Sequence, residues 1–260
     1  MHTRVLNKRK ELIGREFETN CSGKCFIIDY KNSRNVTVMF YDPIYVTNVR
    51  LGNLERGKAV NKMLRSVYGV GYIGDGDYSK KNNNLHYTFW SNMLGRVYGK
   101  SQGKSLPAYV DADVSEEWHN FQNFAAWCET QPFFNAKDDK GRSYQLDKDI
   151  LSPKDNKVYS PHTCSFVPPE INILLIKGDA KRGEYPLGVS YDHERCLFRS
   201  FHNVLGKQKF LGRFSTPEEA FLTYKTAKES HIKSLAEKWK GKVDDKVYEA
   251  LMNWEISIDD

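Results

Sequence analysis

Residues 209–220, with the sequence KFLGRFSTPEEA, have the pattern of a junction between a strand and a helix, and this junction indicates how the C-terminal part of the chain folds. Ser215 or Thr216 suits the N-cap, because its hydroxyl can accept a hydrogen bond from an amide of the first turn. Pro217 suits the first helical position, and the two glutamates after it lie near the positive end of the helix dipole. The stretch predicts that a strand ends at Phe214 and a helix begins at Pro217.

Two more strands are expected before this junction. Residues 187–191 and 196–201 have strand-like composition, and a turn at residues 206–207 precedes the strand at 209–214. After the junction, apolar side chains recur with a helical period, at Ala220, Phe221, Tyr224, Ala227 and Ile232. We expect a three-stranded sheet packed on one helix, followed by a short amphipathic helix at residues 246–254.

A second pattern occupies residues 144–175, where strand, loop, strand and helix follow one another. Two strands, at 144–151 and 164–167, precede a helix that opens on a pair of prolines. Side chains alternate across a strand, so the first strand is expected to place Asp147 and Asp149 on one face. Two carboxylates on one face are candidate ligands for a hard cation, although a solvated strand face is the ordinary interpretation.

The first part of the chain is β-rich, with two strands at residues 24–30 and 35–40 that have the spacing of a hairpin. Glycines at 69, 71 and 74 form GxGxxG, but a polar loop rather than a helix follows them. This context excludes a dinucleotide site, and we interpret residues 68–77 as a linker.

Helices are expected at residues 85–101 and 114–128, the second with an aromatic stripe that we assign to the core. The fold class is therefore α+β and multidomain. The expected domains are a basic β-rich domain at 1–80, a central domain at 81–178, a sheet-plus-helix domain at 179–240 and an acidic tail at 241–260.

Composition limits the class of protein. The 260 residues are 40% hydrophobic and 13% aromatic, which is enough for a packed core and excludes a mostly disordered chain. No run of 18 apolar residues is present, so no membrane span is expected. The five cysteines contain no CxxC pair, which removes the ligand set of a zinc ribbon and favours reduced thiols in the cytoplasm.

The net charge of +6 is unevenly placed. Residues 1–80 and residues 174–242 each carry 14 basic and 8 acidic side chains, whereas residues 81–173 carry 10 and 11. Two basic flanks therefore enclose a near-neutral middle, an arrangement that suits a polyanionic partner held at the flanks.

The C-terminal pattern resembles the Apetala/ethylene-response-factor DNA-binding domain. The resemblance rests on Gly188-Val189-Ser190, on the string LGRFSTPEEA at 211–220, and on Tyr224 and Ala227. That family reads the major groove of DNA with its three-stranded sheet. The resemblance implies duplex DNA as partner, with the following DNA-binding candidates: Arg195, Arg199, His202, Lys207, Lys209 and Arg213.

The middle block resembles phage-encoded HNH-type homing endonucleases, which often carry an Apetala-type domain. The matching patterns are YxxWxxMLxRxY at 87–98, VxxxWxxFxxF at 114–124, LDKDI at 146–150 and NKVYSPxTCxFVxxxxN at 156–172. The resemblance implies that residues 81–178 are a ββα-metal nuclease domain. It also makes Arg96 a candidate for binding a DNA phosphate. The ordinary interpretation of Arg96 is a buried salt bridge or a charge on the helix face.

Phosphodiester cleavage needs a divalent metal and an activated water, and hard oxygen ligands suit Mg²⁺ or a similar ion such as Mn²⁺. The candidate ligands are Asp147, Asp149, Asn156 and Asn172. The family normally places a His base at the end of the first strand, but here Lys148 stands in that place and the nearest histidine is His162. Asp147, Asp149 or His162 then serves as base, or metal-bound water needs none, while Lys148 holds a phosphate or stabilises charge.

The expected function is that of a cytoplasmic, monomeric endonuclease that cuts duplex DNA with a divalent metal, without a membrane or a small-molecule cofactor. If the gene belongs to a phage, the compartment is the host cytoplasm. Its candidate catalytic residues are Asp147, Lys148, Asp149, His162 and Asn172. The alternative is a non-cleaving, sequence-specific DNA-binding regulator with a decayed nuclease core, favoured by the missing histidine.

Overall fold

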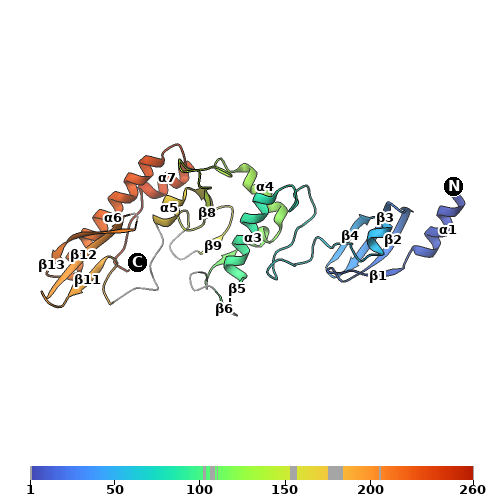
Figure 1. Ribbon diagram of the computed structural model, residues 1–260, viewed down its shortest axis with the longest axis horizontal. Helices are drawn as coiled ribbons and strands as arrows, with labels where there is room; N and C mark the ends of the chain where they lie inside the picture. The colour runs from blue at the N-terminus through green and yellow to red at the C-terminus, as the bar shows by residue number, and fades with distance from the viewer. Residues whose placement is uncertain are drawn as a thin grey trace. The chain divides into compact units, whose positions relative to one another are not determined.

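The computed structural model describes residues 2–101, 104–105, 109, 111–152, 157–174, 184–204 and 206–259. The chain divides into two compact units, residues 1–128 and residues 129–260. Each contains helices and antiparallel sheet, so the expected α+β class is confirmed (Figure 1). The expected central domain at 81–178 contributes its helices to the first unit and its strand–loop–strand–helix to the second.

The first unit begins with a helix that the sequence pattern did not predict, α1 (His2–Leu12). A four-stranded antiparallel sheet follows in the order β1-β2-β3-β4. Its elements are β1 (Glu16–Glu18), β2 (Lys24–Asn32), β3 (Asn35–Tyr41) and β4 (Ile44–Val49), and the short helix α2 (Leu51–Leu54) comes after them. The expected hairpin is confirmed, with Ile27 opposite Val38 in the core.

The second half of this unit is built on an aromatic core. Its helices are α3 (Asn84–Tyr98), the 3₁₀ helix η2 (Glu116–His119) and α4 (Phe121–Thr130). Trp118, Phe121 and Phe124 of the expected stripe are fully buried, which confirms their assignment to the core, and Trp90 on α3 is fully buried as well. The helix expected from residue 114 instead begins at Phe121, because the chain is extended at Asn120 after the 3₁₀ turn. Three two-residue strands also occur here: β5 (Lys100–Ser101), β6 (Lys104–Ser105) and β7 (Asp113–Val114).

The glycine-dense segment is part of this core and not a linker. The amide of Gln122 on α4 donates hydrogen bonds to the carbonyls of Ile73 and Tyr78, each at 2.9 Å. A Cβ at Gly71 would lie 2.9 Å from the Trp90 ring. The glycine therefore allows the segment to lie against α3, a contact that no local pattern predicts.

The second unit contains the expected strand–loop–strand–helix. Strands β8 (Gln145–Asp147) and β10 (Ser165–Val167) are antiparallel, and helix α5 (Pro169–Leu174) follows directly. The short strand β9 (Val158–Tyr159) lies between them in sequence.

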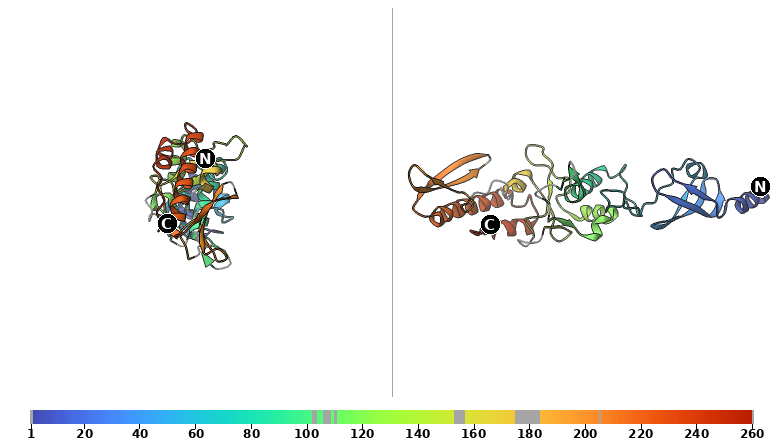
Figure 2. Two further views of the ribbon diagram at one scale, coloured as in Figure 1. Left: turned by 90° about the vertical axis from the view of Figure 1, so that its left-hand side faces the viewer. Right: turned by 90° about the horizontal axis from the view of Figure 1, so that it is seen from below.

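The rest of this unit is the expected sheet and helix. The sheet order is β11 (Val189–Asp192), β12 (Leu197–Val204), β13 (Lys207–Phe214). One face packs on α6 (Pro217–Trp239), as both figures show, and α7 (Asp245–Met252) follows (Figures 1 and 2).

The predicted cap of α6 is confirmed. Thr216 accepts a hydrogen bond from the Glu219 amide at 3.2 Å, and the Glu219 carboxylate reaches back to the Thr216 amide at 3.4 Å. Gly188 explains another part of the motif, because its φ of +76° favours glycine and a Cβ there would overlap the ring of Tyr224 on α6.

The far half of α6 joins the sheet to the hairpin and α5. The Trp239 indole donates to the Glu170 carboxylate at 3.0 Å, and Lys238 donates to the same oxygen at 2.6 Å. The Tyr144 ring lies edge-on to Trp239. These contacts place the hairpin and the sheet in one packed body.

None of the helices in the described part of the chain has the length and apolar character needed to cross a membrane. All five cysteines are free thiols, and Cys25, Cys128 and Cys164 are buried.

Candidate functional site

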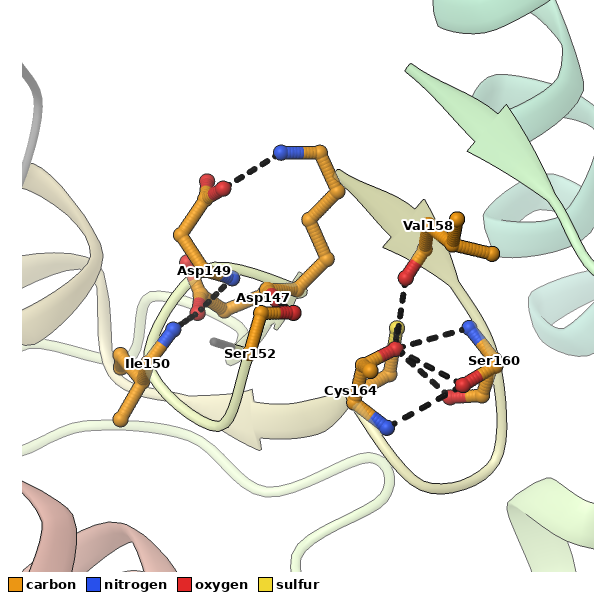
Figure 3. A network of polar contacts seen from close by, with 9 residues as sticks. Asp147, Asp149, Ile150, Ser152, Val158, Ser160 and Cys164 are labelled. Atoms are coloured by element: carbon orange, nitrogen blue, oxygen red, sulfur yellow. Dashed lines mark hydrogen bonds and ion pairs between the residues drawn. The ribbon is translucent and has the colours of Figure 1, made fainter. Parts of the chain in front are cut away.

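Strand β8 ends in a buried carboxylate, that of Asp147. Asp147 lies opposite Ser165 of β10 and is only 7% exposed. Its Oδ1 accepts hydrogen bonds from the amides of Asp149 at 3.0 Å and Ile150 at 2.9 Å (Figure 3). This side-chain turn ends the strand at Asp147, because the amides of Asp149 and Ile150 bond to the Asp147 side chain and not to a neighbouring strand.

The expectation that Asp147 and Asp149 share one strand face is therefore wrong. Asp149 follows the strand, within a bend, and its side chain is 58% exposed. Its carboxylate accepts a hydrogen bond from the Lys148 ammonium at 2.5 Å (Figure 3). The two carboxylates are thus directed to different partners.

Lys148, at the place where the resembling family has its histidine, is buried, with 5% of its surface exposed. Its ammonium also lies 5.6 Å from the centre of the Tyr159 ring, within range of a cation–π contact. Its carbonyl accepts a hydrogen bond from Ser152 at 2.5 Å. The lysine is therefore held in the loop by contacts at both ends.

Burial is the main influence on ionisation at this site. Desolvation raises the pKa of Asp147 to about 6, against the lowering effect of the Ile150 amide. The Cys164 thiol is also buried, and desolvation raises its pKa to about 12, so it is a neutral thiol. Burial thus favours the neutral form of Asp147, and a cation beside the carboxylate favours its charged form.

Asn172 connects the helix to the strand. It lies on α5 and donates a hydrogen bond through Nδ2 to the Oε1 atom of Gln145 at 2.5 Å. Gln145 and Asp147 are two residues apart on β8 and therefore share a face of the strand. The structure brings Asn172 to the face that carries Asp147.

The other two candidates are not part of this arrangement. His162 is exposed in the turn at 160–163, which Ser160 and Thr163 close with hydrogen bonds to each other. Asn156 lies outside the described residues. Across the ranges that the structure describes, no three His, Cys, Asp or Glu side chains lie together as a metal cluster.

Strand register divides the DNA-binding candidates between two faces of the C-terminal sheet. Arg199 lies opposite Arg213, and His202 opposite Lys209. His202 is 4% exposed and contacts His231 and Tyr224 of α6, so its face of the sheet is turned toward the helix.

This register corrects the expected grouping of the basic residues. Arg199 and Arg213 lie on the face away from α6, which we call the open face. His202, Lys207 and Lys209 belong to the α6 side, because Lys207 lies opposite Val204, two residues from His202. Arg195 is exposed in the turn between β11 and β12.

The open face carries residues that sequence reasoning missed. Phe201 lies opposite Phe210, and Asn203 opposite Gln208. Period-two alternation from Arg199 indicates Phe201 and Asn203. On β13 the extra residue Leu211 interrupts the alternation, since Ser200 pairs with Gly212 and Phe201 with Phe210.

Arg96 lies in the other unit. It is exposed in the last turn of α3. A cation there compensates the negative end of the helix dipole, which is the ordinary interpretation of this residue.

The buried histidine pair leads to a prediction of pH dependence. Nε2 of His202 lies 3.1 Å from Nδ1 of His231. Burial lowers the pKa of both rings, and together with the charges of Lys228, His231 and Lys209 it brings the pKa of His202 to about 4. Below the ordinary histidine pKa of about 6.5, the His202 ring binds a proton in the unfolded chain but stays neutral in the folded chain, so protonation favours unfolding.

We therefore expect the second unit to lose about 2–3 kcal/mol of stability as the pH falls from 6.5 to about 4. Urea unfolding midpoints across this range test the prediction. His202→Gln keeps a neutral hydrogen-bonding side chain and should flatten the dependence. Equal pH slopes in the two proteins would contradict it.

Comparisons of this chain with models of protein families, with curated proteins and with solved structures find no match. Function is therefore inferred from the geometry of this chain together with the motifs that resemble known families.

Proposed function

We propose that the chain is a metal-dependent endonuclease of duplex DNA, of the HNH homing type. The observation that carries the proposal is the hairpin–helix of β8, β10 and α5, which holds the buried carboxylate of Asp147 and the amide of Asn172 on one strand face. The same unit carries a sheet with basic residues on its open face. The proposed cutting element and the proposed DNA-binding element therefore belong to one unit.

The donor set fits a hard divalent ion in part. Both hydrogen bonds to Asp147 end on Oδ1, and Oδ2 accepts none from the described residues. Asn172 uses its nitrogen on Gln145, which leaves its oxygen for another partner. Asp147 and Asn172 would hold Mg²⁺ or Mn²⁺, whereas the Asp149 carboxylate forms an ion pair with Lys148. When bound, the ion supplies positive charge that stabilises the leaving oxygen.

Lys148 has a different task from the base that it replaces. A lysine ammonium donates hydrogen bonds and accepts none, so it stabilises negative charge on a phosphate. The exposed carboxylate of Asp149 positions it. The proton of the attacking water then passes to solvent, since Asp149 is paired with Lys148 and His162 is exposed in a separate turn.

The second candidate is a DNA-binding regulator that does not cut. Two observations favour it: the lysine at the position of the family's base, and the absence of a three-residue metal cluster among the described residues. The two candidates agree on duplex DNA and differ only in cleavage.

Metal removal tests the proposal. We expect the protein to cut a supercoiled plasmid library with random inserts in Mg²⁺ or Mn²⁺ and to leave it intact in EDTA, with new ends read by sequencing. Mobility shifts of the same DNA in EDTA report binding separately. Binding without cutting in either metal would replace the endonuclease with the regulator, and no binding would remove both.

A further inference from the structure

The open face of the C-terminal sheet is a ladder of three cross-strand pairs. Along β12 and β13 these pairs are Arg199 with Arg213, Phe201 with Phe210, and Asn203 with Gln208. Because alternate residues share a face, the three pairs follow one another on the same surface. The ladder thus has a cationic end, an apolar centre and an amide end.

The centre is an exposed aromatic pair. The rings of Phe201 and Phe210 are tilted at 55° with centroids 5.5 Å apart, and Phe210 is 47% exposed. Neither ring belongs to the core that the sheet forms with α6. Exposed aromatic surface at the centre of a polar and basic face is typical of a recognition surface.

The cationic end is oriented by a carboxylate. Oδ2 of Asp192 lies 3.5 Å from Nε of Arg213 and 3.9 Å from Nε of Arg199. The guanidinium of Arg213 lies 5.1 Å from the centre of the Phe210 ring, and that of Arg199 lies 5.7 Å from the Phe201 ring. Both contacts with Asp192 are made at Nε, so the terminal nitrogens can bind another acceptor pair.

Each pair matches one kind of base edge in the major groove. Guanidinium groups bind the O6 and N7 acceptors of guanine, carboxamides bind N6 and N7 of adenine, and apolar side chains contact the thymine methyl group. Successive pairs are roughly 6.7 Å apart along a strand, about twice the 3.4 Å rise of a base pair. Three pairs therefore address a site of about five base pairs.

We infer that this ladder reads base identity, and that Phe201 and Phe210 at its centre select a thymine by contact with its methyl group. The arginine pair at one end contacts a guanine, and the amide pair at the other end contacts an adenine. The inference rests on the proposed binding of duplex DNA. Burial of the thymine methyl group against the two rings favours thymine over uracil by about fourfold.

The test compares two duplexes that differ only in this methyl group. Full-length protein in EDTA is titrated, at one salt concentration, with two polymers of the same random-sequence duplex DNA, one made with thymine and the other with uracil in its place. We expect the thymine polymer to bind at least about fourfold more tightly. Phe210→Ser should lower this ratio toward one, and Arg213→Ala should weaken binding to both polymers while preserving the ratio.

Leu222→Ser is the matched control, because Leu222 is a 59% exposed apolar side chain on α6 of the same unit. It should leave the ratio unchanged. A ratio of one in the unmodified protein, or an equal ratio in Phe210→Ser, would overturn the inference and leave DNA binding intact. Failure to bind either polymer at low salt would overturn the proposed function itself.

Discussion

Asp147→Asn is expected to lower the rate of DNA cleavage by on the order of a hundredfold or more, while DNA affinity stays unchanged. Asparagine keeps an oxygen at Oδ1, which can still accept the amide hydrogen bonds of Asp149 and Ile150. The variant thus removes the negative charge and one metal-binding oxygen without removing the turn. Initial cleavage rates in Mg²⁺ measure the effect, and mobility shifts in EDTA measure affinity.

Asp139→Asn is the matched control for this experiment. Asp139 is 76% exposed in the same unit and pairs with Lys242 at 3.5 Å, so its charge is screened by solvent and it has no part in the turn. We expect its cleavage rate to equal that of the unmodified protein. Equal rates for Asp147→Asn and the unmodified protein would refute the assigned role of Asp147.

Trp90→Ala is expected to destabilise the first unit by about 3–5 kcal/mol. The Trp90 side chain is fully buried, its ring lies 5.3 Å from that of Phe121, and its indole donates to the carbonyl of Trp118 at 2.7 Å. Alanine would leave a large cavity and a buried carbonyl without its donor. Because domains have a net stability of about 5–15 kcal/mol, this change removes much of the total.

Denaturant midpoints, combined with amide hydrogen exchange in α3, measure the effect. Trp90→Phe retains most of the ring and loses the donor, so its cost should be smaller. Asn92→Ala, at an exposed position of the same helix, should stay within about 0.5 kcal/mol. A shift for Trp90→Ala no larger than that of Asn92→Ala would contradict the assigned core.

Elements with local causes could be predicted from the amino-acid sequence. The Thr216 cap, the proline at the first helical position and the apolar period predicted α6 and its start, because a cap acts within one turn. The hairpin of β2 and β3 and the order β8, β10, α5 also follow from alternation and turn residues. Asp147 and Asn172 were candidates from the motif that resembles the nuclease family.

Which side chains contact one another depends on long-range packing and strand register, which local patterns do not show. The bulge at Leu211 assigns Phe210 to the open face and Lys209 to the α6 side, and a bulge depends on the partner strand. The turn at Asp147 separates it from Asp149, because its side chain competes with the ladder for two amides. Periodicity predicts the faces of an element, whereas register and side-chain hydrogen bonds decide what each face contacts.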